Sequence, residues 1–197
     1  MNYFPFFLFL MVFSVYSAEM QQTPEIPIEV TILPIDVQCN IWMEVNSVKT
    51  TVITLDTVSL QDIQQATATA KPFTVHIVCT NKSEGTPFHT RWATTGEVDS
   101  ATQALKNTTV SGANNVGFVV NDQSTSPASV VNFESGSSKG YSIKSAGLIA
   151  GNYDCYDLVE YSGCYNWATE YSVGYITYGA PGAGLVTADA TVTINFD

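Results

Sequence analysis

The sequence has few positive charges. Seven Lys and Arg residues stand against 18 Asp and Glu residues, which gives a formal net charge of −11 at pH 7. A surface of this sign repels the phosphates of nucleic acids and the headgroups of anionic lipids, and it favours colloidal solubility. We therefore expect no nucleic-acid partner for this chain.

Beyond the first 18 residues, the sequence also lacks an apolar run of the ~20 residues that a membrane-spanning helix needs. Residues 4–15 are apolar except for Pro5 and Ser14, and the small residues Ser17 and Ala18 follow them. This pattern is typical of a secretory signal peptide. We predict a signal peptide over residues 1–18 and export of the remaining chain.

Long helix formers such as Leu, Arg and Lys are scarce, whereas Thr, Val, Ser and Tyr are abundant. Residues of the second kind suit pleated, half-buried surfaces, so the composition predicts an all-β fold in one domain. Short strands are expected from residue 28 onward and at 47–55, 73–79, 89–94, 116–121, 141–149, 169–178 and 186–196. Strands of this length with turns between them indicate a β-sandwich, and only residues 59–70 have a weak helical pattern.

Cysteine occurs four times, at Cys39, Cys79, Cys155 and Cys164. An even number in an exported chain indicates disulfides, for which three pairings exist. We favour Cys39–Cys79, worth about 4 kcal/mol by loop entropy, and Cys155–Cys164, worth about 2.5–3 kcal/mol. A zinc site is the alternative, but the spacings are not C-x-x-C, and His76 and His89 lie far from the last two cysteines in sequence. We therefore expect no metal and no cofactor.

The C-terminal residues have the clearest strand pattern in the chain. Apolar side chains stand at every second position, and each residue between them is polar: Val186, Ala188, Ala190, Val192, Ile194 and Phe196. Such alternation predicts a strand with one buried and one solvated face. A long strand of this kind at the end of a chain is an exposed edge unless another strand pairs with it.

In these residues the sequence resembles the pilins of the chaperone–usher pathway, and type 1 fimbrial major subunits most closely. That family has an aromatic residue at the penultimate position and a glycine fourteenth from the end, which are the places of Phe196 and Gly184. Residues 171–182 (YSVGYITYGAPG) and 115–122 (NVGFVVND) resemble two further strands of the family. Cys39 and Cys79 match its disulfide pair, with residues 51–58 resembling the strand between them. The resemblance covers most of residues 28–197.

The resemblance implies an incomplete immunoglobulin-like β-sandwich that a donor strand from another chain completes. The groove would be lined by the C-terminal strand: Gly184, Val186, Ala188, Ala190, Val192, Ile194 and Phe196. A periplasmic pilus chaperone would fill it first, and at an outer-membrane usher the N-terminal extension of a neighbouring pilin would replace the chaperone. The product would be a head-to-tail homo- or hetero-polymer on the cell surface. The implied function is a structural, non-enzymatic fimbrial subunit that contributes to cell adhesion after export to the periplasm.

The same resemblance divides the mature chain into an N-terminal extension, residues 19–27 or to about 30, and a pilin domain, residues 28–197. The large apolar residues available for donation are Met20, Ile26, Ile28 and Val30. Pilin donor segments usually alternate apolar residues around a glycine. This extension departs from that pattern, because it contains Pro24 and Pro27 and lacks glycine.

Residues 153–171 form an aromatic-rich stretch around the last two cysteines, and ordinary pilins lack it. One interpretation is a disulfide-tied loop that packs over the sandwich or against the next subunit. The other is a surface contact with a host glycan through Tyr156, Tyr161 and Trp167, since exposed rings stack well on sugars.

Two other classes of protein remain as alternatives at this point. A standalone secreted carbohydrate-binding β-sandwich would share the composition and the strand pattern. A hydrolase is disfavoured: the G-x-S-x-G pattern at residues 136–140 requires a histidine after the serine, and both histidines precede it.

Overall fold

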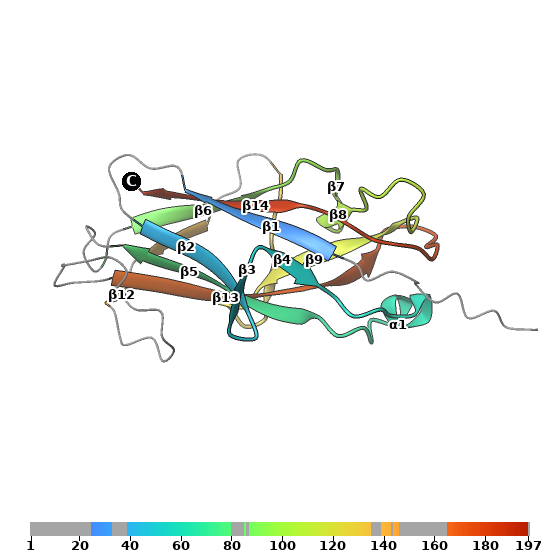
Figure 1. Cartoon of the computed structure of the whole chain (residues 1–197). Coiled ribbons are helices and arrows are strands. Elements are labelled where there is room, and N and C mark those ends of the chain that lie inside the picture. Colours follow the sequence, from blue (N-terminus) through green and yellow to red (C-terminus); the bar gives the residue numbers. More distant parts are fainter. Residues whose placement is uncertain are drawn as a thin grey trace, which may run out of the picture.

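The computed structural model describes residues 25–32, 39–79, 85, 87–134, 139–142, 144–145 and 165–196. In this part of the chain, two β-sheets pack face to face as a sandwich (Figure 1). The five-stranded sheet has the order β11 (Lys139–Ser142), β6 (Pro87–Ala93), β14 (Ala190–Phe196), β1 (Glu25–Ile32) and β4 (Val52–Thr54). The all-β prediction is confirmed.

The second sheet has nine strands. Its main path runs β3 (Val48–Thr50), β2 (Cys39–Val45), β5 (Lys71–Cys79), β13 (Tyr165–Thr177), β9 (Val116–Asp122), β8 (Ala104–Lys106) and β7 (Val98–Asp99). The short strands β10 (Ser129–Val130) and β12 (Lys144–Ser145) pair with β9 and β13, respectively. Among the described residues, no helix is long and apolar enough to cross a membrane.

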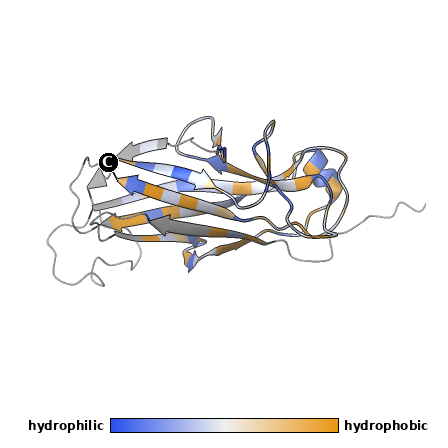
Figure 2. Cartoon of the chain, turned by 90° about the horizontal axis from the view of Figure 1, so that it is seen from above, coloured by the Kyte–Doolittle hydropathy of each residue, from blue (hydrophilic) through white to orange (hydrophobic). Residues whose placement is uncertain are grey.

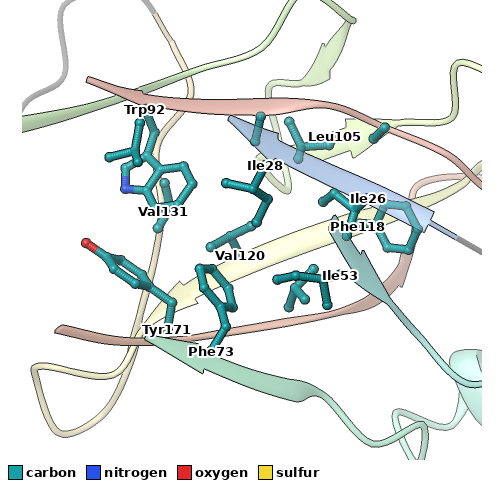
Figure 3. Close-up of a cluster of buried hydrophobic side chains, with 14 of the residues drawn as sticks. Ile26, Ile28, Ile53, Phe73, Trp92, Leu105, Phe118, Val120, Val131 and Tyr171 are labelled. Carbon is teal, nitrogen blue, oxygen red and sulfur yellow. The ribbon is translucent and has the colours of Figure 1, made fainter. Parts of the chain in front are cut away.

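The core lies between the two sheets and consists of the inward-facing residues of both (Figure 3). Ile26 and Ile28 of β1 reach from one sheet toward Phe118 and Val120 of β9 in the other. All four side chains are fully buried, with relative exposures of 0%. Burying an isoleucine side chain contributes about 1.5–3 kcal/mol, so β1 is an integral part of the core.

One helix, α1 (Leu60–Gln64), lies among the described residues, within the predicted range 59–70. Ser59 and Asp62 form a capping box at its start, and Ile63 anchors it to the core. The helix ends after one turn because Ala66 adopts a φ of 54°. Figures 1 and 2 place α1 and the end of β14 at opposite ends of the sandwich.

The strand boundaries differ from the prediction at two important places. The regular ladder of the C-terminal strand begins at Ala190 rather than at residue 186. β13 begins at Tyr165 rather than at residue 169, so it takes in the end of the aromatic-rich stretch. One strand, β1, also crosses the expected boundary between the N-terminal extension and the pilin domain.

Candidate functional site at the C-terminal strand

β14 lies inside the five-stranded sheet, and its alternation has the predicted orientation. Ala190, Val192 and Ile194 face the core and are at most 1% exposed, whereas Thr191 and Thr193 are half-buried on the outer face. Val186 and Ala188, which precede the regular ladder, are also buried. The strand therefore presents a continuous apolar wall to the interior.

The first flank of β14 is β6, which pairs with it in the antiparallel direction from Thr191↔Ala93 to Phe196↔Phe88. The rings of Phe196 and Phe88 lie 5.7 Å apart between centroids, and Phe88 meets Trp167 of β13 edge to face at 5.2 Å. Phe196 is thus a packing residue at the end of the wall. These ring contacts join the end of β14 to both sheets.

The second flank is the chain's own β1, which pairs with β14 in the parallel direction. Ile28 lies opposite Ala190, Val30 opposite Val192 and Ile32 opposite Ile194. On its other side, β1 pairs with β4 through three residue pairs, from Glu25↔Thr54 to Pro27↔Val52. The sequence predicts an open groove beside β14 until another chain fills it, whereas in this structure β1 fills it.

The structure therefore brings the predicted donor residues and the predicted acceptor wall together within one chain. Ile26 and Ile28 are fully buried in the core. The side chain of Val30 and all of Met20 lie outside the described residues. Sequence reasoning missed the self-pairing, although its signal was the alternation of Ile26, Ile28 and Val30, which fits the inner face of the same sandwich.

Polar side chains fasten the segment just before β14. The Asp189 carboxylate accepts a hydrogen bond from the Thr95 backbone N–H at 2.8 Å and another from the Thr95 hydroxyl at 2.9 Å. The Asn107 side chain holds the backbone of Leu185 and Thr187. No sequence pattern around Asp189 or Asn107 indicates these contacts, because their partners lie far away in the chain.

The backbone places Cys39 directly opposite Cys79 in the ladder of β2 and β5. Opposed residues in an antiparallel pair have Cα atoms about 4.5–5.5 Å apart, within the range that a disulfide spans. The Cys39–Cys79 disulfide stays a prediction that this register supports. Cys155 and Cys164 lie outside the described residues.

The predicted surface role of Trp167 is wrong. Its side chain is 4% exposed and belongs to the core, where it packs against Phe88. The reason is that residues 165–177 form one strand in which Trp167 alternates in phase with the buried Tyr171 and Val173. Tyr156 and Tyr161 lie outside the described residues.

His76 is a buried structural residue on the outer face of the nine-stranded sheet. Its ring stacks on Trp42 at 5.0 Å with an interplanar angle of 7°, and its Nε2 lies 3.7 Å from Glu44 Oε2. Burial lowers the pKa of His76, while the Glu44 carboxylate opposes that shift. In the part of the chain that the structure describes, no group of three or more His, Cys, Asp and Glu side chains is placed to hold a metal ion.

Together, the fold and the site define a class: an immunoglobulin-like sandwich in which an N-terminal segment supplies the strand beside the C-terminal one. The profile described as "Fimbrial protein" matches residues 26–197. The chain therefore belongs to the fimbrial protein family, whose members are structural pilus subunits. This membership favours the pilus subunit over the standalone carbohydrate-binding module.

Among solved structures, the CupB6 tip adhesin from Pseudomonas aeruginosa is similar at 11% identity, with a TM-score of 0.33. The match covers 89% of this chain and 42% of the adhesin chain, so this chain spans less than half the length of that protein. No curated protein matches the sequence.

Proposed function

We propose that this chain is a pilus subunit whose joining site is the β1-facing edge of β14, and that β1 is the strand exchanged between subunits. The observation that carries the proposal is the pairing of β1 with β14 along the predicted acceptor wall. A neighbour's β1 could occupy the same place after the chain's own β1 has left it. This is β-augmentation, in which ladder hydrogen bonds supply affinity and side-chain pockets supply register.

The two flanks of β1 differ in a way that supports its exchange. On the β4 side three residue pairs and one further backbone hydrogen bond, from the Ile28 N–H to the Thr51 carbonyl, hold it, and one of the pairs involves Pro27, which has no N–H to donate. On the β14 side five residue pairs hold it. The main cost of releasing β1 is therefore the exposure of Ile26, Ile28 and the edge of β14, and an incoming strand with similar side chains would restore these contacts.

Replacing the chain's own β1 by an identical strand of a neighbour has an energetic consequence. An identical strand makes the same contacts within a chain or between chains, but the intramolecular pairing has the advantage of effective concentration. A closed monomer is therefore the expected resting state of the isolated chain. Assembly needs a partner that binds the open form, which is the role we assign to a periplasmic chaperone acting with an outer-membrane usher.

These partners imply the localisation of the protein. After removal of residues 1–18, the chain enters the periplasm, is held open by the chaperone and joins a head-to-tail polymer at the cell surface. We propose no catalytic activity and no cofactor for it. A glycan contact stays a prediction for Tyr156 and Tyr161 alone.

The proposal is tested with the full mature chain and a fluorescent peptide copying residues 23–32. Peptide uptake is measured by anisotropy, and its location by amide hydrogen exchange across β14. We expect slow uptake by the wild type. We expect at least tenfold faster uptake by Ile28→Ala, because that substitution weakens the packing of the chain's own β1 without altering β14.

The matched control is Thr193→Ala, which alters the outer face of β14 and leaves its apolar wall intact. It should take up the peptide at the wild-type rate. If Ile28→Ala took up the peptide no faster than Thr193→Ala, or if bound peptide left the β14 amides unprotected, β14 would not be the joining site.

A further inference from the structure

The segment that leads into β14 is fixed by one side chain on the loop at residues 107–113. Asn107 Nδ2 donates hydrogen bonds to the carbonyl oxygens of Ala113 at 3.0 Å and Leu185 at 2.8 Å. Its Oδ1 accepts hydrogen bonds from the backbone N–H groups of Thr109 at 3.0 Å and Thr187 at 2.9 Å. An amide side chain has two N–H donors and two acceptor positions, so Asn107 uses its full capacity here.

Two glycines allow the backbones to come this close. Gly184 has a φ of +151°, and a Cβ atom there would lie 2.6 Å from the Ala113 nitrogen and 2.8 Å from the Gly112 carbonyl carbon. A Cβ atom on Gly112 would collide with the Leu185 carbonyl oxygen. The structure therefore gives Gly184, which the sequence marks as the start of the groove, a packing role: it lets the segment before β14 dock on the loop at residues 107–113.

Further bonds reinforce this docking at the same residues. The Thr108 backbone N–H donates to the Thr187 carbonyl at 2.8 Å, and the Ala113 N–H donates to the Leu185 carbonyl at 2.9 Å. The hydroxyls of Thr109 and Thr187 lie 2.6 Å apart. The backbone bonds would form with any residue, but the Thr187 hydroxyl contacts and the close approach at Gly184 depend on the identity of these two residues.

The apolar alternation of the C-terminal strand does not by itself fix its register. Its apolar residues repeat every second position from Val186 to Phe196, so a slip by two residues would keep every apolar side chain on the inner face. Alternation therefore excludes a one-residue slip but only weakly excludes a two-residue slip. When Asn107 docks this segment on the loop, the hydroxyl contacts of Thr187 and the close approach at Gly184 are satisfied only in the observed register, which removes this ambiguity.

We propose that Asn107 is a positioning residue that sets the register of β14, and through it the register of any strand paired with β14. The inference rests on the proposed function only for its last clause, because the register against the chain's own β1 exists without a partner. In the correct register, Ala190 meets Ile28 and Val192 meets Val30. A neighbour's strand would find the wall in this same alignment.

The test compares Asn107→Ala with Asn107→Asp in the full mature chain. The first removes all four bonds, and the second keeps the acceptors for Thr109 and Thr187 but loses both donors. Register is measured without any partner, by NMR contacts between β1 and β14 and between β6 and β14. We expect one set of contacts in the wild type and a second set, offset by two residues, in Asn107→Ala. Asn107→Asp should shift at least as far as Asn107→Ala, because its second carboxylate oxygen would face the carbonyl oxygens of Ala113 and Leu185.

Two controls separate positioning from simple loss of stability. Asn114→Asp changes an exposed residue next to the same loop and should keep one register. Leu60→Ala trims a side chain on α1 that packs against the core, so it should lower stability and also keep one register. We also expect β14 amides to exchange at least tenfold faster in Asn107→Ala than in Leu60→Ala at matched global stability.

A single, unshifted register in Asn107→Ala, together with β14 exchange no faster than in Leu60→Ala, would overturn the proposal. The register of β14 is measured without any peptide. Failure of the wild type to take up the peptide would therefore contradict strand exchange and leave the role of Asn107 in the register of β14 standing.

Discussion

The two flanks of β14 are built differently. β6 pairs with it in the antiparallel direction and is joined to it by the rings of Phe88 and Phe196. β1 pairs with it in the parallel direction. On its far side, β1 pairs with the three-residue strand β4. Aromatic packing joins one flank to both sheets, whereas the other depends on a single strand, whose Ile26 and Ile28 are buried. On the proposed exchange, β14 would have one permanent neighbour, β6, and one replaceable neighbour, β1.

The largest effect is expected from Ile194→Asp. Ile194 is fully buried and contributes to the wall that both flanks share, so a carboxylate there is an unpaired buried charge. Losses above about 4 kcal/mol are typical of such changes, so we expect loss of folding and of fibres. Urea unfolding and electron microscopy would measure this. Thr193→Asp, which places the same charge on the outer face, should still form fibres.

The two flanks of β14 should differ in whether an added peptide can rescue a truncated side chain. Ile28→Ala and Phe88→Ala should each destabilise the isolated chain, by about 2–5 and about 3–5 kcal/mol, respectively, because both side chains are fully buried. A saturating peptide copying residues 23–32 should raise the unfolding midpoint of Ile28→Ala but not that of Phe88→Ala. Equal rescue of both variants would mean that the flanks do not differ in replaceability.

A smaller effect is expected where β14 is fastened at its start. Asp189→Ala removes the carboxylate that accepts hydrogen bonds from the N–H and the hydroxyl of Thr95. Hydrogen bonds to a charged group contribute about 1.5–3 kcal/mol, so the free energy of unfolding should fall by about that amount. Asp56→Ala, at an exposed position, should change it by no more than about 0.5 kcal/mol. An Asp189→Ala chain as stable as that control would show that the fastening is unimportant.

The smallest effect lies away from both flanks. The pKa of His76 is lowered by burial, so below pH 6.5 the unfolded chain binds a proton that the folded chain resists. Stability from this group is therefore complete above pH 6.5 and declines as the pH falls toward the folded-state pKa. Urea titrations at several pH values should show this slope in the wild type and a reduced slope in His76→Gln. An unchanged slope in the variant would assign the pH dependence to other groups.

Much of the fold could be predicted, because alternation reports which face of a strand is buried. The inward positions of β14 and the strands β5 and β9 follow directly from it. The partner of each strand could not be predicted in this way, because ladder hydrogen bonds come from the backbone and leave no trace in residue types. The assignment of β1 to its own β14 and the length of β13 both depend on such pairing.

The polar contacts of the site were beyond prediction for a different reason. Asn107 lies 78 residues from Leu185, which it contacts. Nothing local to either residue indicates the other. Trp167 illustrates the opposite error, because aromatic content near two cysteines suggested a loop although its phase with Tyr171 and Val173 already fitted a strand.

The occupancy of the β14 edge by β1 has a consequence for where a polymer can grow. On the proposed exchange, each subunit has one such strand and one such edge. A free subunit can satisfy both at once by folding back on itself. The subunit at the growing end of a polymer cannot, because its strand is already committed to the neighbour while its edge is vacant. Self-closure would therefore keep free monomers from joining one another in solution. A growing end, by contrast, would always be able to bind the strand of another subunit.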